Sequence, residues 1–329
     1  MNQETKTNVL LKVKDLVVEY SSGGETVYAV NGVSFSLKKG ETLGLVGETG
    51  AGKTTIAKTI MRVLPDRASR VRSGEIILDG VNLLSLSEKN MRKIRGKKVS
   101  MVFQDPMTSL NPVFTVGDQI LEVVKLHENT SGKEAYERTL DILEKVGIHK
   151  ERFGEYPHQF SGGMKQRVVI AMALACNPEL IIADEPTTAL DVTIQAQVMD
   201  MILKLKDEQD TSMILITHDL GVVAEASDDI AVVYAGKIIE IGSKEEIFDF
   251  TSHPYTQGLF DSIPSLDSDQ KRLKPIPGLP VDPTIEPRGC SFYERCKYST
   301  KECIEGNIEM TEIRPDHYCR CIHPLLGEP

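Results

Sequence analysis

The stretch that decides the fold is "GETGAGKT", which runs from Gly47 to Thr54. It fits the pattern G-x-x-x-x-G-K-[ST] of a phosphate-binding loop, whose glycines let backbone N–H groups curl around phosphates. The apolar run "ETLGLVG" leads into it, and apolar residues at helical spacing follow it as far as Pro65. This order of strand, loop and helix predicts a nucleotide-binding α/β fold.

The loop predicts a site for the phosphates of a nucleotide. Lys53 is expected to reach the phosphate oxygens, and the Thr54 hydroxyl is expected to ligate Mg2+. The helix N-terminus adds positive potential. The predicted nucleotide-binding residues of this segment are Gly47, Glu48, Thr49, Gly50, Ala51, Gly52, Lys53, Thr54 and Thr55.

Outward from the loop, the chain alternates between strand and helix patterns. Val33, Phe35 and Leu37 alternate with polar residues, which predicts a half-buried strand. The short apolar runs in "LIIADEP" and "MILITHD" predict buried parallel strands. Between about residues 115 and 150 the 3.6-residue period predicts a helical insert, and the frequent prolines after Pro254 predict a linker or loop-rich extension.

A pair of carboxylates follows the run "LIIA", at the carboxyl end of a predicted strand, where ligands of such sheets bind. Asp184 is positioned to hold Mg2+ through water, and Glu185 to orient and deprotonate the attacking water. The alternative reading of the pair is a solvated acidic turn, which the phosphate-binding loop disfavours.

A second anion-binding helix start is predicted in "QFSGGMKQRVVIAMALAC". Ser161 has the character of an N-cap, and Gly162 and Gly163 leave helix amides uncovered. An ordinary capped helix is the alternative. The apolar stretch that follows predicts a buried helix, on which Cys176 is a packed core thiol.

Composition narrows the classes of function. The chain has 329 residues and a formal net charge of −10, which disfavours a sequence-independent grip on nucleic acid. The N-terminal residues lack the apolar segment of a secretory signal, and no apolar run approaches the ~20 residues of a membrane helix. These two features predict a cytosolic protein. The length predicts two domains, or one domain with an elaborate appendage.

Taken together, the motifs resemble those of the ATPase subunit of an ABC transporter, over about residues 8 to 250. The loop resembles Walker A, Asp184 and Glu185 resemble Walker B, and "FSGGM" resembles the signature motif, with Phe160 and Met164 as departures. Gln104 of "VFQDP" resembles the Q-loop, Ala189 to Asp191 the D-loop, and His218 the switch histidine.

The resemblance implies a P-loop ABC ATPase cassette of the α/β class. Such a cassette has a mixed sheet core, an antiparallel β subdomain and a helical subdomain, here followed by a loop-rich extension that contains cysteines. We expect the nucleotide-binding domain to span residues 1–253, with its helical subdomain at about 106–165, and the extension to span residues 254–329.

The resemblance also implies roles for individual residues. Two cassettes pair head to tail, so that ATP on the Walker A loop of one meets Ser161, Gly162 and Gly163 of the other. Tyr20 would stack on adenine, with Tyr28 the second choice for that role. The implied ligands of Mg2+ are Thr54, Gln104 and Asp184, and the implied catalytic residues are Glu185, His218 and Lys53.

The extension resembles the tails of ATPases that serve oligopeptide, dipeptide and nickel importers. The resemblance lies in "HPYTQGL", from His253 to Leu259, and in "PIPGLPVDPTIEPRGCSFYERC". It implies two transmembrane permease subunits, an extracytoplasmic substrate-binding protein and a second ATPase, with a heterodimer favoured over a homodimer. The chain would lie peripherally on the cytoplasmic face of the inner membrane.

Three functions stay open at this point. An ATPase for import of di- and oligopeptides leads, with nickel or a metal chelate as the alternative substrate. A soluble ABC ATPase acting on nucleic acid or ribosomes is disfavoured by the negative charge. A metal-responsive protein, with a regulatory cassette, is the third.

Five of the six cysteines lie between residues 290 and 321. Cys290, Cys296, Cys303 and either Cys321 or Cys319 supply the four thiolates that a [4Fe-4S] cluster or a zinc site requires. Some tails of the resembled family imply an iron–sulfur cluster, and "RCIH" favours Cys321 as the fourth ligand. Zinc and a set of packed, metal-free thiols are the alternatives.

Overall fold

The computed structural model of the protein describes residues 8–188, 190–262 and 275–325. The chain divides into two compact units, which are described in turn. The first unit comprises Met1–Leu10, Leu37–Thr42 and Asn82–Thr217, and the second comprises Leu11–Ser36, Leu43–Val81 and His218–Pro329. None of the helices in the described parts of the chain is long and apolar enough to cross a membrane.

A buried parallel sheet forms the centre of the first unit. Its described strands, in the order β8-β7-β6, are β6 (Val99–Val102), β7 (Leu180–Asp184) and β8 (Ser212–Ile216). Every residue of these strands is buried, as their uninterrupted apolar runs require. The predicted buried parallel strands at "LIIADEP" and "MILITHD" are therefore confirmed.

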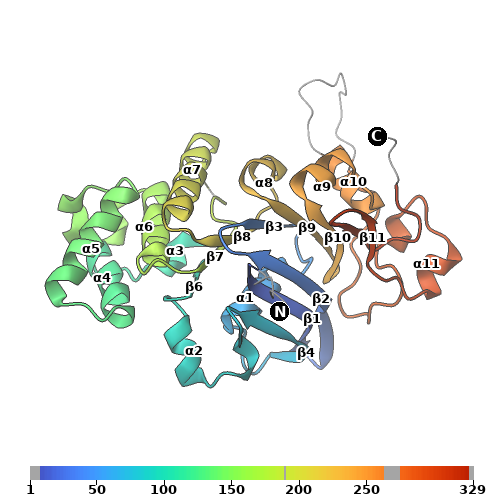
Figure 1. The fold of residues 1–329 in the computed structure, drawn as a ribbon, viewed down its shortest axis with the longest axis horizontal. Helices are drawn as coiled ribbons and strands as arrows, with labels where there is room; N and C mark the ends of the chain where they lie inside the picture. Colours follow the sequence, from blue (N-terminus) through green and yellow to red (C-terminus); the bar gives the residue numbers. More distant parts are fainter. Residues whose placement is uncertain (1–7, 189, 263–274, 326–329) are drawn as a thin grey trace, which may run out of the picture. The chain divides into compact units, whose positions relative to one another are not determined.

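Most of the other regular structure in the described part of the first unit is helical. The helices are η1 (Leu83–Ser85), α2 (Glu88–Ile94), α3 (Pro106–Ser109), α4 (Val116–His127), α5 (Gly132–Lys145), η2 (Lys150–Gly154), η3 (Pro157–Gln159), α6 (Gly162–Leu174) and α7 (Val192–Glu208). Figure 1 shows α4, α5 and α6 packed side by side. The helical insert predicted between about 115 and 150 is confirmed as α4 and α5, which begin at the N-caps Thr115 and Ser131.

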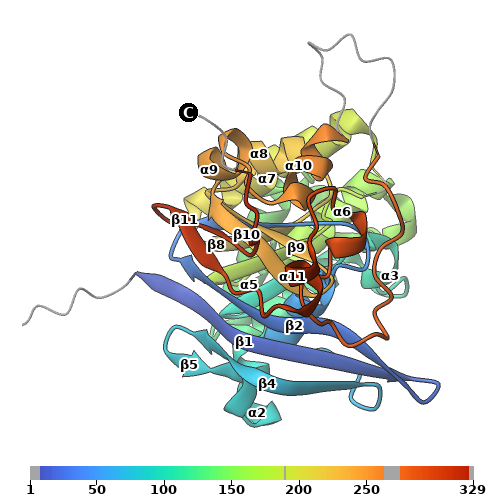
Figure 2. The ribbon, with the colours of Figure 1, turned by 90° about the vertical axis from the view of Figure 1, so that its right-hand side faces the viewer.

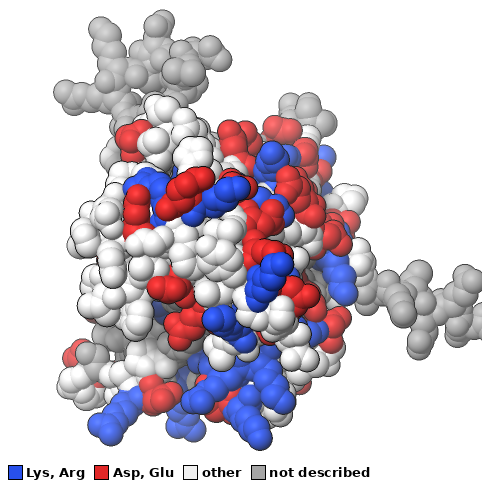
Figure 3. All heavy atoms as spheres, turned by 90° about the vertical axis from the view of Figure 1, so that its left-hand side faces the viewer, with Lys and Arg blue, Asp and Glu red and all other residues white. Residues whose placement is uncertain are grey.

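Charge pairing on the solvent side supports α5. Lys133 with Glu137, and Lys145 with Asp141, are ion pairs at a spacing of four residues. Figure 3 shows acidic and basic side chains interspersed over the upper and middle parts of the face that it draws, with basic side chains gathered along its lower edge. Each such pair stabilises a helix by only about 0.2–0.5 kcal/mol, so the buried face of α5 does most to hold it.

An antiparallel sheet makes up one part of the second unit. Its order is β2-β1-β4-β5, with β1 (Val9–Ser22), β2 (Glu25–Lys38), β4 (Ser69–Leu78) and β5 (Val81–Asn82). In Figure 2 the long strands β1, β2 and β4 run alongside one another. Val33, Phe35 and Leu37 are buried while Ser34 and Ser36 are exposed, which confirms the predicted half-buried strand.

A second, mixed set of strands follows in the same unit. These strands have the order β11-β12-β10-β9-β3, with β3 (Thr42–Val46), β9 (Asp229–Tyr234), β10 (Lys237–Ser243), β11 (Thr311–Arg314) and β12 (His317–Cys319). Strands β3 and β9 are parallel, whereas the other pairs are antiparallel. The mixed sheet, the antiparallel sheet and the helical part together confirm the predicted α/β fold class.

The helices of the second unit are short. They are α1 (Lys53–Met61), α8 (Leu220–Ala226), α9 (Lys244–Asp249), α10 (Pro254–Asp261), η4 (Tyr293–Arg295) and α11 (Lys301–Glu305). Helix α1 ends before Val63 and Leu64, because Arg62 takes a left-handed conformation and caps the carbonyls of the last turn. The extension begins as helix α10 and not as a loop, since Pro254 occupies its first turn, where proline costs no hydrogen bond.

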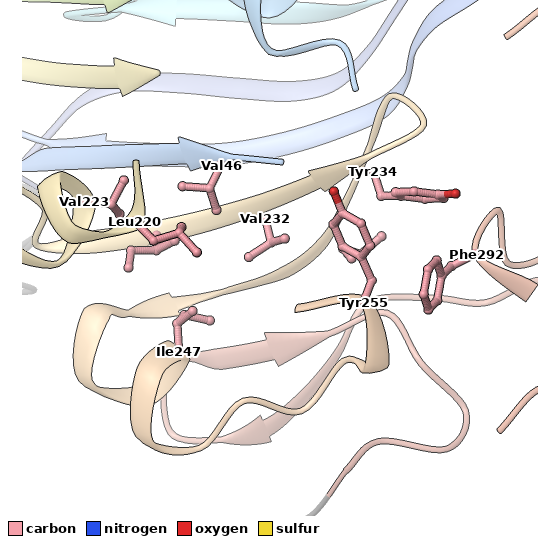
Figure 4. Close-up of a cluster of buried hydrophobic side chains, with 10 residues drawn as sticks. Val46, Leu220, Val223, Val232, Tyr234, Ile247, Tyr255 and Phe292 are labelled. Atoms are coloured by element: carbon pink, nitrogen blue, oxygen red, sulfur yellow. The ribbon is translucent and has the colours of Figure 1, made fainter. Parts of the chain in front are cut away.

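Residues of the extension belong to the core of the second unit. Tyr255 and Phe292 are buried in one cluster with Val46, Val232 and Tyr234, as Figure 4 shows. Segments far apart in the sequence therefore share one core. The compact units accordingly do not follow the division at residues 253 and 254 that the motifs suggest.

Candidate ATP-binding and hydrolysis residues

The phosphate-binding loop connects β3 to α1 in the second unit. Two of its glycines cannot be replaced by larger residues, because of their backbone conformation and because a side chain would clash with neighbouring atoms. Gly47 and Gly52 have φ of 149° and 103°, outside the range of most residues with a side chain. A Cβ at Gly47 would lie 2.1 Å from the carbonyl oxygen of Val233, and one at Gly52 would lie 2.4 Å from that of Ala29. The loop can therefore keep this path only with glycine at both positions.

Lys53 is the first residue of α1, and it bends back over the loop. Its ammonium group donates hydrogen bonds to the carbonyl oxygens of Gly47, at 2.7 Å, and of Glu48, at 3.0 Å. The first turn of α1 holds no acidic residue of its own, and the positive end of the helix faces the loop. This is the arrangement that phosphate groups bind.

Tyr20 lies next to the start of α1, where the resemblance predicts an aromatic partner for adenine. Its hydroxyl is 3.3 Å from the hydroxyl of Thr55, which is two residues beyond Lys53. Tyr28, the second choice, lies in a pocket with Glu48 to Ala51 and with prolines of the extension, and its N–H donates to the carbonyl of Pro283. Stacking of either ring on adenine stays a prediction.

The two carboxylates lie in the first unit, at the carboxyl end of β7. Asp184 ends the strand and is 2% exposed. Glu185 takes a left-handed conformation with φ of 48°, and its N–H donates to the carbonyl of Ile216 at 2.8 Å. A non-glycine residue in this conformation stores strain, and such residues cluster at functional sites.

The side chain of Glu185 meets the predicted Q-loop residue. Gln104 donates a hydrogen bond from Nε2 to Oε2 of Glu185 at 2.7 Å, and the Thr188 hydroxyl donates to the same oxygen at 2.9 Å. The fold thus brings together two residues, 81 positions apart, that belong to different predicted motifs. A hydrogen bond between an amide and a carboxylate here orients the carboxylate without neutralising it.

The signature motif forms the start of α6, as predicted. Ser161 is the N-cap, and its hydroxyl accepts a hydrogen bond from the N–H of Met164. A Cβ at Gly163 would lie 2.8 Å from Cγ2 of Ile194, whereas a Cβ at Gly162 would meet nothing within 4 Å. Packing against the described residues explains why position 163 is a glycine, but it does not explain why position 162 is one.

Four further positions were predicted from the sequence, and three of them lie within the described residues. His218 follows β8 and is exposed, and it directly precedes Asp219, the N-cap of α8. Ala189 lies outside the described residues. Asp191, the last residue of the predicted D-loop, is the N-cap of α7 and accepts a hydrogen bond from the N–H of Ile194. Cys176 is 4% exposed, which confirms the predicted core thiol, but it lies in the turn after α6 and not on the helix, because the helix ends at Leu174.

Four cysteines of the extension line one small pocket in the second unit. They are Cys290, Cys296, Cys303 and Cys321. Burial raises the pKa of the Cys321 thiol to about 11, and it also raises the pKa of Cys290 and Cys296. Cys319 does not line this pocket, because it lies on β12 opposite Glu240 of β10. The structure thus groups the four cysteines that the sequence favoured.

His253 lines the same pocket with an unused polar atom. Its Nδ1 accepts the N–H of Tyr255 at 3.0 Å, and burial lowers the pKa of the imidazole to about 4. The ring is therefore neutral, with its proton on Nε2. That atom is buried and has no hydrogen-bond partner within the described residues. A buried donor of this kind requires an explanation.

The described cysteine, histidine and acidic residues include no group of three that is arranged to hold a single metal ion. The four thiols and the unused N–H of His253 nevertheless match, in chemical type and number, the ligands and second shell of an iron–sulfur cluster.

Comparison with known proteins identifies the class first. The family described as "ABC transporter" matches residues 30–188. Among solved structures, the dimeric ATP-binding cassette MJ0796, in a post-hydrolysis state bound to ADP and Pi, has a TM-score of 0.64 and 30% identity. The similarity covers 71% of this chain and 99% of that one. The chain is an ATPase of the ATP-binding cassette class.

A second family match, in the C-terminal part of the chain, specifies the kind of transporter. The family described as "Oligopeptide/dipeptide transporter, C-terminal region" matches residues 239–303. The oligopeptide transport ATP-binding protein OppD of Bacillus subtilis is 50% identical over 96% of this chain and 89% of its own length. The dipeptide transport ATP-binding protein DppD of the same organism is 52% identical over 95% and 94%. The chain belongs to this family of ATP-binding subunits of peptide ABC transporters.

Proposed function

We propose that this protein hydrolyses ATP to drive the import of di- and oligopeptides across a membrane. The observation that carries the proposal is the similarity to OppD and DppD over nearly the whole chain, including the C-terminal region that simple cassettes lack. The substrate would be delivered by an extracytoplasmic binding protein to two permease subunits. The chain itself would lie peripherally on the cytoplasmic face of the inner membrane.

In this proposal each residue group acts on the same ATP. The phosphate-binding loop and Lys53 hold the β- and γ-phosphates, and Tyr20 stacks on adenine. Glu185, held by Gln104 and Thr188, accepts a proton from the attacking water. His218 contacts the γ-phosphate. Ser161, Gly162 and Gly163 of a second cassette close the site from the other side.

Mg2+ belongs to the same proposal. Thr54, Gln104 and Asp184 offer a hydroxyl, an amide and a carboxylate, the hard oxygen ligands that this ion prefers. When bound, Mg2+ neutralises charge on the phosphates. The two neighbouring carboxylates then have different roles. Asp184 holds the ion, and Glu185 accepts a proton from the attacking water.

The partner cassette is proposed to be a related second ATPase and not an identical chain. In many resembled importers the two ATPases differ, and the intact Glu185 of this chain fits either arrangement. Affinity purification of the tagged chain from membranes tests this point. A second ATPase and two polytopic proteins in the purified complex support it, and a complex with only one kind of cassette contradicts it.

The function is tested by transport in the organism's own cells. In a strain that lacks the gene, the wild-type gene should restore uptake of labelled di-, tri- and pentapeptides. Glu185→Gln should not restore it, although the protein accumulates normally. Glu179→Gln is the matched control, because Glu179 is a partly exposed residue paired with Lys98 at 3.0 Å. Restored uptake of nickel or a nickel chelate without peptide uptake would instead support the alternative substrate.

A second proposal concerns the cysteine pocket. We infer that Cys290, Cys296, Cys303 and Cys321 hold an iron–sulfur cluster, with Cys319 as the alternative fourth ligand and zinc as the alternative metal. Their shared pocket supports the proposal, and the unused Nε2–H of His253 offers a hydrogen-bond donor to a sulfur atom. The extension after residue 275 contains little regular structure, so a cluster would act as its staple.

A further inference from the structure

The first variable residue of the phosphate-binding loop, Glu48, is held by the C-terminal extension. Arg295 donates two hydrogen bonds to its carboxylate, from Nη1 to Oε2 at 2.7 Å and from Nη2 to Oε1 at 2.9 Å. This bidentate geometry is the strongest form of an Arg–carboxylate pair. The two residues are 247 positions apart in the sequence.

Arg295 is itself fixed on several sides. Its side chain is 4% exposed, and its Nε donates to the carbonyl of Pro277 at 2.9 Å. Its Nη1 also donates to the hydroxyl of Tyr234 at 3.3 Å, and the guanidinium lies 5.8 Å from the ring centres of Tyr234 and Phe292. An arginine with this many contacts cannot change rotamer freely, so it holds Glu48 in one position.

The main chain of Glu48 is held by a second residue of the extension. Its N–H donates a hydrogen bond to the hydroxyl oxygen of Tyr255 at 2.9 Å. Tyr255 is fully buried, and Figure 4 shows its ring packed with those of Tyr234 and Phe292. The ring centres lie 4.6 Å and 5.4 Å from that of Tyr255. The hydroxyl of Tyr255 is therefore placed by a rigid aromatic cluster.

The position of Glu48 affects that of Lys53, whose ammonium group also donates to the carbonyl of Gly47. The carbonyl oxygen of Glu48 accepts a hydrogen bond from Nζ of Lys53 at 3.0 Å and another from the N–H of Ala51 at 3.1 Å. A shift of Glu48 would move both the lysine and the turn that presents the loop amides. Phosphate binding needs these groups placed before the ligand arrives.

We propose that Arg295 and Tyr255 are positioning residues of the ATP site, which fix Glu48 and thereby hold the phosphate-binding loop and Lys53 in their binding geometry. The cassette would then depend on its extension for full affinity toward ATP. The competing explanation is that the Arg295–Glu48 pair only anchors the extension to the core. The two explanations differ in whether ATP binding changes when the pair is broken in a folded protein.

The test measures the Kd of the full-length chain for MgATP by calorimetry. Glu48→Gln keeps the size of a partly exposed side chain, so it should fold normally, and Arg295→Gln breaks the pair from the other side. Each should weaken MgATP binding roughly ten- to hundredfold, the effect expected from a small displacement of binding groups. The double variant should bind no more weakly than Arg295→Gln alone, because both changes remove one interaction.

Two further variants separate positioning from anchoring. Tyr255→Phe removes only the acceptor of the Glu48 N–H and should also weaken MgATP binding. Arg314→Gln breaks a more exposed arginine–glutamate pair of the extension, with Glu246 at 2.8 Å, and should leave the Kd within about twofold because Glu246 belongs to α9 and not to the loop. In the assembled transporter, Arg295→Lys should raise KM for ATP less than Arg295→Gln does.

The proposal is overturned if Glu48→Gln and Arg295→Gln fold and bind MgATP with the wild-type Kd, whether or not their unfolding temperature falls. That result would assign the pair to anchoring alone. Equal weakening by Arg314→Gln would also overturn it, since the effect would then be one of general stability.

Discussion

At the scale of single residues, Cys321 and Cys319 are separated by one position but have different surroundings. Cys321 lines the pocket shared with Cys290, Cys296 and Cys303, whereas Cys319 is buried on β12. We therefore expect anaerobically purified Cys321→Ser protein to lose bound iron, acid-labile sulfide and broad visible absorption. Cys319→Ser should keep all three, because its thiol does not face the pocket.

Cys319→Ser also serves as the control for thiol removal. Loss of iron from Cys319→Ser, with iron retained in Cys321→Ser, would reverse the ligand assignment. Zinc in place of iron in the wild-type protein, under the same handling, would replace the cluster with the alternative metal. Wild-type protein free of any metal would leave the four cysteines as packed thiols.

The residues proposed to act on ATP could be picked out from the sequence, because their signal is local. Gly47, Lys53 and Glu185 lie within short motifs whose strand and helix context is also local. Arg295 and Tyr255 were not predicted as part of the site, although "HPY" and "ERC" stood in the segments that carry the resemblance. Arg295 is 247 positions away from Glu48 in the sequence, and Tyr255 is 207 positions away. No local pattern predicts that residues so far apart are in contact, so these contacts are seen only in the folded structure.

At the scale of elements, the start of α6 presents two adjacent glycines in different situations. Gly163 is crowded by Ile194, so alanine there should destabilise the isolated chain by a clash within it. Gly162 has open space around its Cβ position, so Gly162→Ala should leave the unfolding temperature unchanged. If the open space receives the second cassette, Gly162→Ala should reduce ATP hydrolysis by the assembled complex by about tenfold or more.

The measurements for this prediction are thermal unfolding of the purified chain and phosphate release by the transporter. Gly132→Ala is the matched control, since Gly132 also lies in the first turn of a helix and has nothing near its Cβ position. It should affect neither quantity. Full hydrolysis by the Gly162→Ala complex would show that this residue does not meet the opposing nucleotide closely.

Element type was easier to predict than element ends. Amphipathic periodicity placed α4 and α5 correctly, and uninterrupted apolar runs placed β7 and β8. Apolar spacing suggested that α1 extends to Leu64, but a left-handed Arg62 ends it at Met61. Frequent prolines suggested loop from Pro254, yet that proline begins α10, because the first turn of a helix needs no donor from it.

At the scale of the whole molecule, the extension is part of the core and not a detachable tail. Tyr255 and Phe292 pack against Val46, Val232 and Tyr234, and β12 pairs with β10. The carboxylate of Glu240, fully buried in β10, also accepts a hydrogen bond from the N–H of Ser252 and contacts the ring of His317. Removing the extension would uncover an apolar surface and a buried carboxylate together.

We therefore expect a chain that ends at residue 253, the boundary suggested by the motifs, to lose cooperative folding and MgATP binding. Burial of one large aromatic side chain is worth about 1.5–3 kcal/mol, and loss of several such contacts approaches the total stability of a domain. Phe292→Ala alone should cost about 3–5 kcal/mol. Thermal unfolding followed by circular dichroism, with calorimetry for MgATP, measures both effects.

A chain that ends at residue 325 provides the control, because it keeps α10, β11 and β12, and it should unfold at the wild-type temperature. A soluble 1–253 chain that unfolds cooperatively would contradict the shared core. If that chain also bound MgATP with the wild-type Kd, Arg295 and Tyr255 could not be positioning the phosphate-binding loop. A third result is a folded 1–253 chain that binds MgATP more weakly than the wild type. It would show that the extension is needed to position the phosphate-binding loop but is not needed for folding.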